Sequence, residues 1–213
     1  MTQILVIRHG ESVANQEDKF AGITDYNLTE RGKKQAEKVA DYIKEHFTVN
    51  AVYASDLLRA YNTALPTANA FGLKVNPTQA FREIHGGRWE DVTYDEIWKN
   101  DGEIFSLWST DYRNAYCPEG ETIKQVTVRA QAETRRIAEA HDGETVVLAA
   151  HATPVWAIRE LAQENNKEYT NTSLAPNASI TILKYEDGKF FEIRHSITEH
   201  LGDLATFLTV LED

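Results

Sequence analysis

Two short apolar runs in this sequence each end directly in a histidine, and this feature constrains the fold more than any other. The first run, Gln3–Arg8, is followed by His9, and the second, Thr145–Ala150, is followed by His151. Apolar runs of this length predict strands that are buried on both faces, as in a parallel sheet covered by helices. Because parallel strands present their carboxyl ends at the same edge of the sheet, we expect the two histidines to meet.

Strand and helix patterns alternate through most of the chain, which predicts an α/β fold of three α/β/α layers around a mostly parallel sheet. Further strands are expected at residues 51–54 and 73–76, and a hairpin at residues 180–185 and 190–197. Helices are expected from the cap Thr29 to about residue 46, from Ser55 to before Gly72, from Thr122 to about residue 141, and from Thr153-Pro154 onward. Pro66 should kink the second of these helices or mark a restart, and the tail from Glu199 is expected to be helical.

The stretch from residue 86 to residue 117 differs from the rest of the chain because it is rich in aromatic residues. They are Trp89, Tyr94, Trp98, Phe105, Trp108, Tyr112 and Tyr116. We expect this stretch to form a small, mostly helical cap, inserted over the edge of the sheet within a single domain of residues 1–213. The spacing of Thr93 and Glu96 is typical of a capping box and predicts a helix start. The rings are expected mainly to pack the cap, with one or two of them contacting a ligand.

The composition narrows the range of partners and compartments. The formal net charge is −11, which disfavours nucleic acid and anionic membranes as partners. Cys117 is the only cysteine, so an internal disulfide is impossible, as suits a reducing cytosol. No segment of the sequence approaches the roughly 18 apolar residues of a membrane span. We therefore expect a cytoplasmic protein, either a monomer or a homodimer.

An arginine beside a histidine at the end of a buried strand indicates chemistry on an anion, and phosphate is the leading candidate. A guanidinium group offers a fork of donors that matches phosphate oxygens. Arg59 lies near the start of the helix that follows the strand at residues 51–54, and so at the same edge of the sheet. Two arginines and two histidines at one point repel one another unless an anion lies among them. An acidic protein that binds phosphate needs such a local positive pocket.

The segment Arg8-His9-Gly10-Glu11-Ser12 resembles the signature of the histidine phosphatase superfamily, also called phosphoglycerate mutase-like. Further segments resemble that family in the expected order: residues 20–29, residues 30–36, residues 55–64 around Arg59, Arg82-Glu83 with Trp89-Glu90, residues 118–122, and His151. Together the matches span roughly residues 3 to 155. The resemblance implies the three-layer fold above and points to the phosphatase branch.

The resemblance also implies a role for each matched residue. His9 would be the nucleophile and form a phosphohistidine, while Arg8, Arg59 and His151 would hold the phosphoryl oxygens. Glu83 would protonate the leaving alkoxide and then act as base on the attacking water. Asn15 would add a neutral donor, and the other substrate-binding positions would be Gly22, Ile23, Thr24 and Ala152. No metal and no cofactor are implied.

Some positions depart from the family pattern. Ala152 occupies a place after the second histidine where family members often have glycine. Gly86 and Asp91 depart from the usual pattern of the loop that carries the acid Glu83, which we call the acid loop. These differences concern the pocket for the leaving group more than the pocket for the phosphoryl group. Three other carboxylates compete with Glu83 for the role of acid: Glu11, Glu90 and Glu121.

The sequence leaves three functions open. The favoured one is a phosphatase that hydrolyses small phosphate monoesters. The second is a cofactor-dependent-type phosphoglycerate mutase, which needs extra basic residues near the acid loop to grip a carboxylate, whereas residues 83–96 offer only Arg88. The third is a non-catalytic relative that binds phosphate or a protein, which predicts a lost nucleophile or acid, yet His9 and Glu83 are both present.

Overall fold

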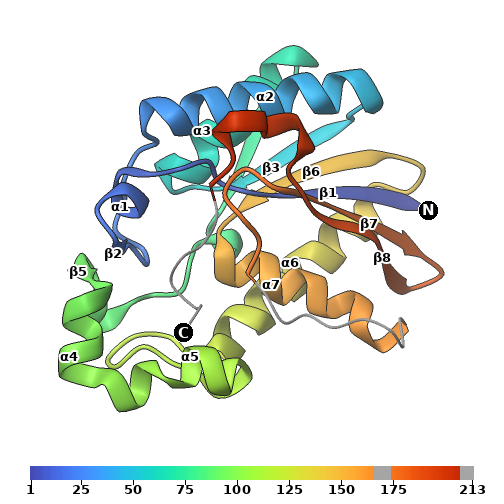
Figure 1. Cartoon of the computed structure of the whole chain (residues 1–213). Coiled ribbons are helices and arrows are strands. Elements are labelled where there is room, and N and C mark those ends of the chain that lie inside the picture. Colours follow the sequence, from blue (N-terminus) through green and yellow to red (C-terminus); the bar gives the residue numbers. More distant parts are fainter. Residues whose placement is uncertain (166–173, 207–213) are drawn as a thin grey trace.

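The computed structural model of the chain describes residues 1–165 and 174–206 (Figure 1). Six strands form its central sheet, in the spatial order β4-β3-β6-β1-β7-β8. Their bounds are β1 (Thr2–Arg8), β3 (Ala51–Ser55), β4 (Val75–Thr78), β6 (Thr145–Ala150), β7 (Ile180–Glu186) and β8 (Lys189–Ile197). The four strands from β4 to β1 are mutually parallel. At the other edge, β7 pairs antiparallel with β1, and β8 pairs antiparallel with β7. The sheet is therefore mostly parallel, as the sequence predicts.

The register of the two central strands brings the two histidines to one place. Strand β1 pairs in parallel with β6 from Gln3 opposite Thr145 to Arg8 opposite Ala150. His9 and His151 are thus each the first residue beyond a paired strand end, and the His9 N–H donates to the carbonyl oxygen of Ala150 at 2.9 Å. Their predicted meeting is confirmed.

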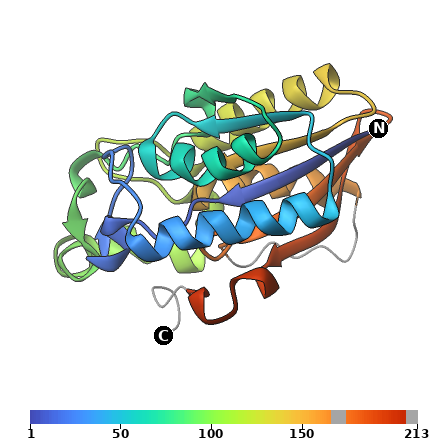
Figure 2. The ribbon, with the colours of Figure 1, turned by 90° about the horizontal axis from the view of Figure 1, so that it is seen from above.

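Helices cover both faces of the sheet. Helices α2 (Glu30–His46) and α3 (Leu58–Ala70) lie on one face, and α6 (Ile123–Ala140) and α7 (Ala152–Arg159) lie on the other (Figure 1). Viewed from above, α2 and α3 lie side by side along the strands (Figure 2). These elements make the three predicted α/β/α layers.

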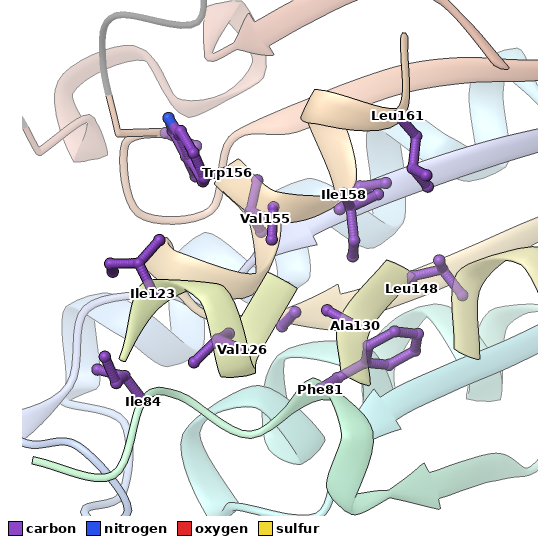
Figure 3. Close-up of a cluster of buried hydrophobic side chains, with 14 of the residues drawn as sticks. Phe81, Ile84, Ile123, Val126, Ala130, Leu148, Val155, Trp156, Ile158 and Leu161 are labelled. Carbon is purple, nitrogen blue, oxygen red and sulfur yellow. The ribbon is translucent and has the colours of Figure 1, made fainter. Parts of the chain in front are cut away.

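The alternation of side chains along β1 divides the core into two halves. Ile4 and Val6 belong to the cluster under α6 and α7, whereas Leu5 and Ile7 belong to the cluster under α2 and α3. Figure 3 shows part of the first cluster, where Val126 of α6 and Val155 of α7 are drawn with Leu148 of β6. Burial on both faces explains why these strands are continuous apolar runs rather than alternating ones.

Helix α3 starts later than predicted and passes through its proline. It begins at Leu58 rather than Ser55, because the carboxylate of Asp25, from a distant loop, accepts the Leu58 N–H at 2.7 Å and supplies the missing cap. The helix continues through Pro66 without the predicted restart. Its buried face, which includes Ala64 and Ala68, offsets the lost backbone hydrogen bond.

Two other predicted boundaries also shift. Helix α7 begins at Ala152, so that Pro154 occupies its third position rather than its first, and strand β4 begins at Val75 rather than Leu73. Residues Glu199–Leu204 form a short 3-10 helix, and residues 207–213 of the predicted helical tail lie outside the described residues.

A group of small elements lies beyond the carboxyl end of the sheet, far from the N-terminus (Figures 1 and 2). They are α1 (Val13–Gln16), β2 (Lys19–Phe20), β5 (Val92–Thr93), α4 (Tyr94–Phe105), α5 (Leu107–Thr110) and a 3-10 turn at Tyr112–Asn114. Strand β2 pairs with β5, and the predicted capping box of Thr93 and Glu96 is present at the start of α4. That residues 86–117 act as a cap within one domain remains a prediction.

Candidate active site

A cavity of about 90 Å³ lies at the carboxyl end of the sheet. This is small beside the roughly 300–1,000 Å³ of pockets that bury drug-sized ligands. Seven of the ten residues predicted for the site line it: Arg8, His9, Asn15, Gly22, Arg59, Glu83 and Ala152. The structure therefore brings to one place most of the residues that the family resemblance selected.

His9 is fixed with one ring nitrogen committed to the backbone. Its Nδ1 lies 2.7 Å from the carbonyl oxygen of Gly10, which can only accept a hydrogen bond, so Nδ1 carries the proton and Nε2 bears the lone pair. The pKa of His9 lies well below 6.5, first because the ring is buried and then because Arg59 and Arg8 are close. A neutral imidazole whose Nε2 is unprotonated is the form that attacks an electrophile.

The backbone around His9 is held by hydrogen bonds from other elements. The Gly10 N–H donates to the Thr63 hydroxyl of α3 at 3.0 Å, and the Asn177 side-chain amide donates to the His9 carbonyl oxygen at 3.1 Å. The same Asn177 amide donates to Oδ1 of Asn15 at 3.2 Å. Because the Ser12 N–H also donates to that oxygen, Asn15 keeps its own amide group as a donor for the cavity it lines.

Two buried arginines flank His9. Arg8 is 4% exposed and Arg59 is 1% exposed. Arg59 donates to the carbonyl oxygens of Thr24 at 2.8 Å and Gly22 at 2.6 Å, and Arg8 donates to that of Ala175 at 2.7 Å. Burial lowers the pKa of both guanidinium groups, and the nearby charge of Glu83 opposes that shift. Within the described residues, Nε of Arg8 has no partner.

His151 is completely buried, and its ring lies edge-on to that of His9 with 5.0 Å between the centroids. Neither of its ring nitrogens bonds to any part of the chain that the structure describes. Burial, followed by the charge of Arg59, holds its pKa well below 6.5. Since buried polar groups are normally paired, these free nitrogens beside His9 suit a bound anion.

Of the four candidate acids, Glu83, Glu11, Glu90 and Glu121, Glu83 is the one that lines the cavity. It accepts the N–H of Thr153, at the start of α7, at 3.3 and 3.4 Å, and its own neighbour's N–H at 2.9 Å. Glu11 instead bonds to the Thr29 hydroxyl at 2.7 Å. Glu121 bonds to an arginine of α6, and Glu90 bonds to backbone amides.

The predicted positions Ile23 and Thr24 are not brought to the cavity lining. Their N–H groups donate to the carboxylate of Glu90, at 2.8 and 3.0 Å. Gly22 does line the cavity, with a φ of +45°, and a Cβ there would lie 2.0 Å from Oε1 of Glu90. The Glu90 carboxylate thus fixes this loop. The N–H groups of Ile23 and Thr24 are occupied by that carboxylate and are not available to a substrate in the cavity.

Arg129 of α6 is a residue that sequence reasoning missed. It donates to the carbonyl oxygens of Ala80, Arg82 and Glu83, at 2.8, 2.6 and 3.0 Å. Arg129 also forms an ion pair of 2.9 Å with Glu121. The Glu121 carboxylate in turn accepts the N–H of His85 at 2.9 Å. This clamp holds both ends of the loop that presents Glu83. No short-range signal marks it, because an arginine inside an amphipathic helix is ordinary.

Among the residues it describes, the structure shows no cluster of metal-binding side chains and no helix that could span a membrane. No three His, Cys, Asp or Glu side chains are placed to hold a metal ion in residues 1–165 and 174–206. Within the same ranges, no helix has both the length and the apolar character needed to cross a bilayer.

Comparison with known proteins agrees with the geometry. The sequence matches the family model described as histidine phosphatase superfamily (branch 1) over residues 4–198. Phosphoserine phosphatase 1 of Hydrogenobacter thermophilus is 30% identical over 95% of this chain and 96% of its own. The metal-independent phosphoserine phosphatase of Arabidopsis thaliana is 28% identical over 96% of this chain and 85% of its own. The solved structure of Bacillus stearothermophilus YhfR matches with a TM-score of 0.85 and 26% identity, covering 94% of this chain and 100% of that one. The chain therefore belongs to the histidine phosphatase superfamily.

Proposed function

We propose that this protein is a phosphoric monoester hydrolase that acts on small phosphate monoesters through a phosphohistidine on His9, without a metal. The observation that carries this proposal is the state of His9. Its Nδ1–H donates a hydrogen bond to the Gly10 carbonyl oxygen, and its lowered pKa keeps Nε2 unprotonated in a cavity that two arginines also line.

In the first step, Nε2 of His9 attacks phosphorus, the N–P bond forms, and the bond from phosphorus to the ester oxygen breaks. Arg8 and Arg59 offset the negative charge of the phosphoryl oxygens, and a ring N–H of His151 donates to them. Glu83, in its protonated form, gives its proton to the leaving alkoxide, which departs as an alcohol. This proton donation by Glu83 matters most for esters of alcohols that are poor leaving groups.

In the second step, water attacks phosphorus and the N–P bond breaks, which restores neutral His9. The Glu83 carboxylate takes a proton from that water and is thereby ready for the next ester. The cationic groups that stabilise charge in the first step do so again. The chain's own arginines and histidines thus supply the electrostatic stabilisation that a metal ion supplies in other phosphatases.

The mutase alternative needs a cation that grips a second anionic group, and the loop around Glu83 brings none to the cavity among the described residues. Arg88, the one basic residue of the acid loop, is exposed and donates to Asp101, and it does not line the cavity. The phosphatase proposal is also supported by the names of the two relatives above. The non-catalytic alternative is disfavoured because nucleophile, acid and both arginines share one cavity.

The cellular setting belongs to the same proposal. We place the enzyme in the cytoplasm, because its single cysteine is buried and excludes an internal disulfide. The net charge of −11 supports a small-molecule substrate rather than nucleic acid or an anionic membrane. Its assembly as monomer or homodimer remains a prediction.

The test is phosphate release from a panel of monoesters, with and without a chelator, by wild type and His9→Ala. His195→Ala, at an exposed position of β8, is the matched control. We expect wild type and the control to release phosphate whether or not the chelator is present. We expect no phosphate release by His9→Ala. Activity that survives His9→Ala, or that the chelator abolishes, would refute the mechanism. Interconversion of phosphoglycerates without phosphate release would favour the mutase.

A further inference from the structure

Apolar and aromatic side chains line the cavity together with Arg8, His9 and Arg59. We call this apolar part of the lining the aromatic wall and define it as Phe20, Tyr94, Phe105, Trp108 and Leu174. In the proposed reaction Arg8, His9 and Arg59 engage the phosphoryl group, so the wall is the part of the lining that is left to contact the leaving alcohol. The wall therefore determines which esters the enzyme accepts.

The rings of the wall hold one another in place. Phe20 and Trp108 meet edge-to-face with centroids 5.5 Å apart, and Phe105 lies 6.3 Å from Trp108. Phe20, Phe105 and Trp108 are all buried. An interlocked set of buried rings is a preformed apolar surface, which gains free energy when it covers an apolar group and loses it when it desolvates a charge without a partner.

Among the described residues, Lys19 is the one cation of the cavity lining besides Arg8 and Arg59, and its charge is already neutralised. Its ammonium lies 3.1 Å from a carboxylate oxygen of Glu17 and 3.1 Å from one of Asp91. A substrate carboxylate on this side would meet a site of net negative charge. The two remaining cations of the lining, Arg8 and Arg59, are engaged by the phosphoryl group in the proposed mechanism.

The wall also carries two neutral donors, the hydroxyl of Tyr94 and the buried Nε1 of Trp108. Nε1 of Trp108 has no partner within the described part of the chain. Burial raises the pKa of Tyr94 to about 12, so its hydroxyl stays protonated near neutral pH. Such donors accommodate an ether or hydroxyl oxygen, but they do not supply the charge that a carboxylate needs.

We infer that the preferred substrates are phosphate monoesters of neutral alcohols with an aromatic or otherwise apolar body, and not phosphorylated amino acids or hydroxy acids. This inference rests on the proposed phosphatase function and specifies the leaving group. It separates this chain from the relatives that are named for phosphoserine.

The test compares kcat/KM for benzyl phosphate and phosphoserine, because both release a primary alcohol and differ in charge and in apolar surface. We expect benzyl phosphate to be favoured by at least roughly tenfold. Equal values, or a preference for phosphoserine, would overturn the inference while leaving the phosphatase function intact. If neither ester nor p-nitrophenyl phosphate released phosphate, the proposed function itself would fail.

Two variants locate the cause of the preference. Phe105→Leu removes part of the wall yet keeps the core filled, and should lower kcat/KM for benzyl phosphate several-fold, on the order of the loss of a few apolar contacts. Inhibition by inorganic phosphate should not change. Ile193→Ala, which removes an exposed apolar side chain of β8 outside the lining, is the control. An equal loss in the control would contradict the role of the wall.

Asp91→Asn tests the neutralised lysine. Asp91 is exposed, and asparagine tolerates its φ of +63°, so the loop is preserved. Freed from one carboxylate, Lys19 should raise kcat/KM for phosphoserine several-fold, in line with surface charge effects, and leave that for benzyl phosphate within twofold. A fall for phosphoserine would show that the site already recognises carboxylates and would overturn the inference.

Discussion

At the scale of single residues, the site consists of charged and titratable groups kept apart from water. His9 and His151 are buried beside Arg8 and Arg59, and burial is the largest cause of their lowered pKa values. The uncharged rings limit the repulsion within this cluster until an anion binds. The protonation state required for attack is therefore a property of the folded chain rather than of the substrate.

A titration of the imidazole ring signals by NMR tests this state. We expect the midpoints of His9 and His151 to lie well below pH 6.5, so that both rings are neutral across the physiological range. Arg59→Met should raise the midpoint of His9, because a positive charge that disfavours imidazolium is removed. A wild-type midpoint at or above 6.5, or a lower one in the variant, would count against this account.

Sequence reasoning succeeded for those residues whose position follows from a strand end. Arg8, His9 and His151 directly follow or end apolar runs, so their place at the sheet edge could be predicted. The prediction that Ile23 and Thr24 line the substrate site failed, because the orientation of their amides depends on the carboxylate of Glu90, which is distant in the sequence. Contacts of this kind join residues far apart in the chain and leave no local pattern.

At the scale of secondary-structure elements, helix α6 positions the loop that carries Glu83. Arg129 projects from this helix and bonds to three carbonyl oxygens of residues 80–83, while Glu121 binds the amide of His85. The helix itself was predicted from its capping box at Thr122, which is present. Its contribution to the site was not predictable, since it depends on how the helix packs against that loop.

Arg129→Ala should therefore weaken general acid catalysis selectively. We expect kcat/KM for alkyl phosphates to fall by about tenfold to a hundredfold, and that for p-nitrophenyl phosphate to fall much less, because a good leaving group needs little protonation. Arg136→Ala is the control, since it removes the same charge from an exposed site on the same helix. Thermal melts establish that each variant is folded. An equal loss for both esters would refute the positioning role.

At the scale of the whole molecule, the mostly parallel sheet is what assembles the site. Residues from β1, α3, the loop before α4 and the start of α7 converge because the carboxyl ends of β1, β3 and β6 share one edge. The alternation of strands and helices made this architecture predictable. The late start of α3 was not, because its cap comes from Asp25 rather than from a neighbouring residue.

The burial of two neutral histidines should also appear in the stability of the fold. Unfolded histidines bind protons near pH 6.5, whereas the folded rings resist protonation, so the unfolded state binds more protons below that pH. The free energy of unfolding should fall as the pH drops from 7 toward 5, by up to about 1.4 kcal/mol per pH unit for each ring. Urea denaturation followed by circular dichroism measures it. The double variant His9→Gln, His151→Gln should show a shallower slope, and an unchanged slope would contradict the assignment.

The central claim is that His9 carries the phosphoryl group, and trapping that intermediate tests it most directly. The enzyme would be mixed briefly with p-nitrophenyl phosphate, quenched in alkali because phosphohistidine is labile to acid, and digested for mass spectrometry. We predict one phosphoryl group on the peptide that contains His9, and none in His9→Ala. Turnover without a phosphorylated enzyme, or a phosphoryl group on any other residue, would contradict the account.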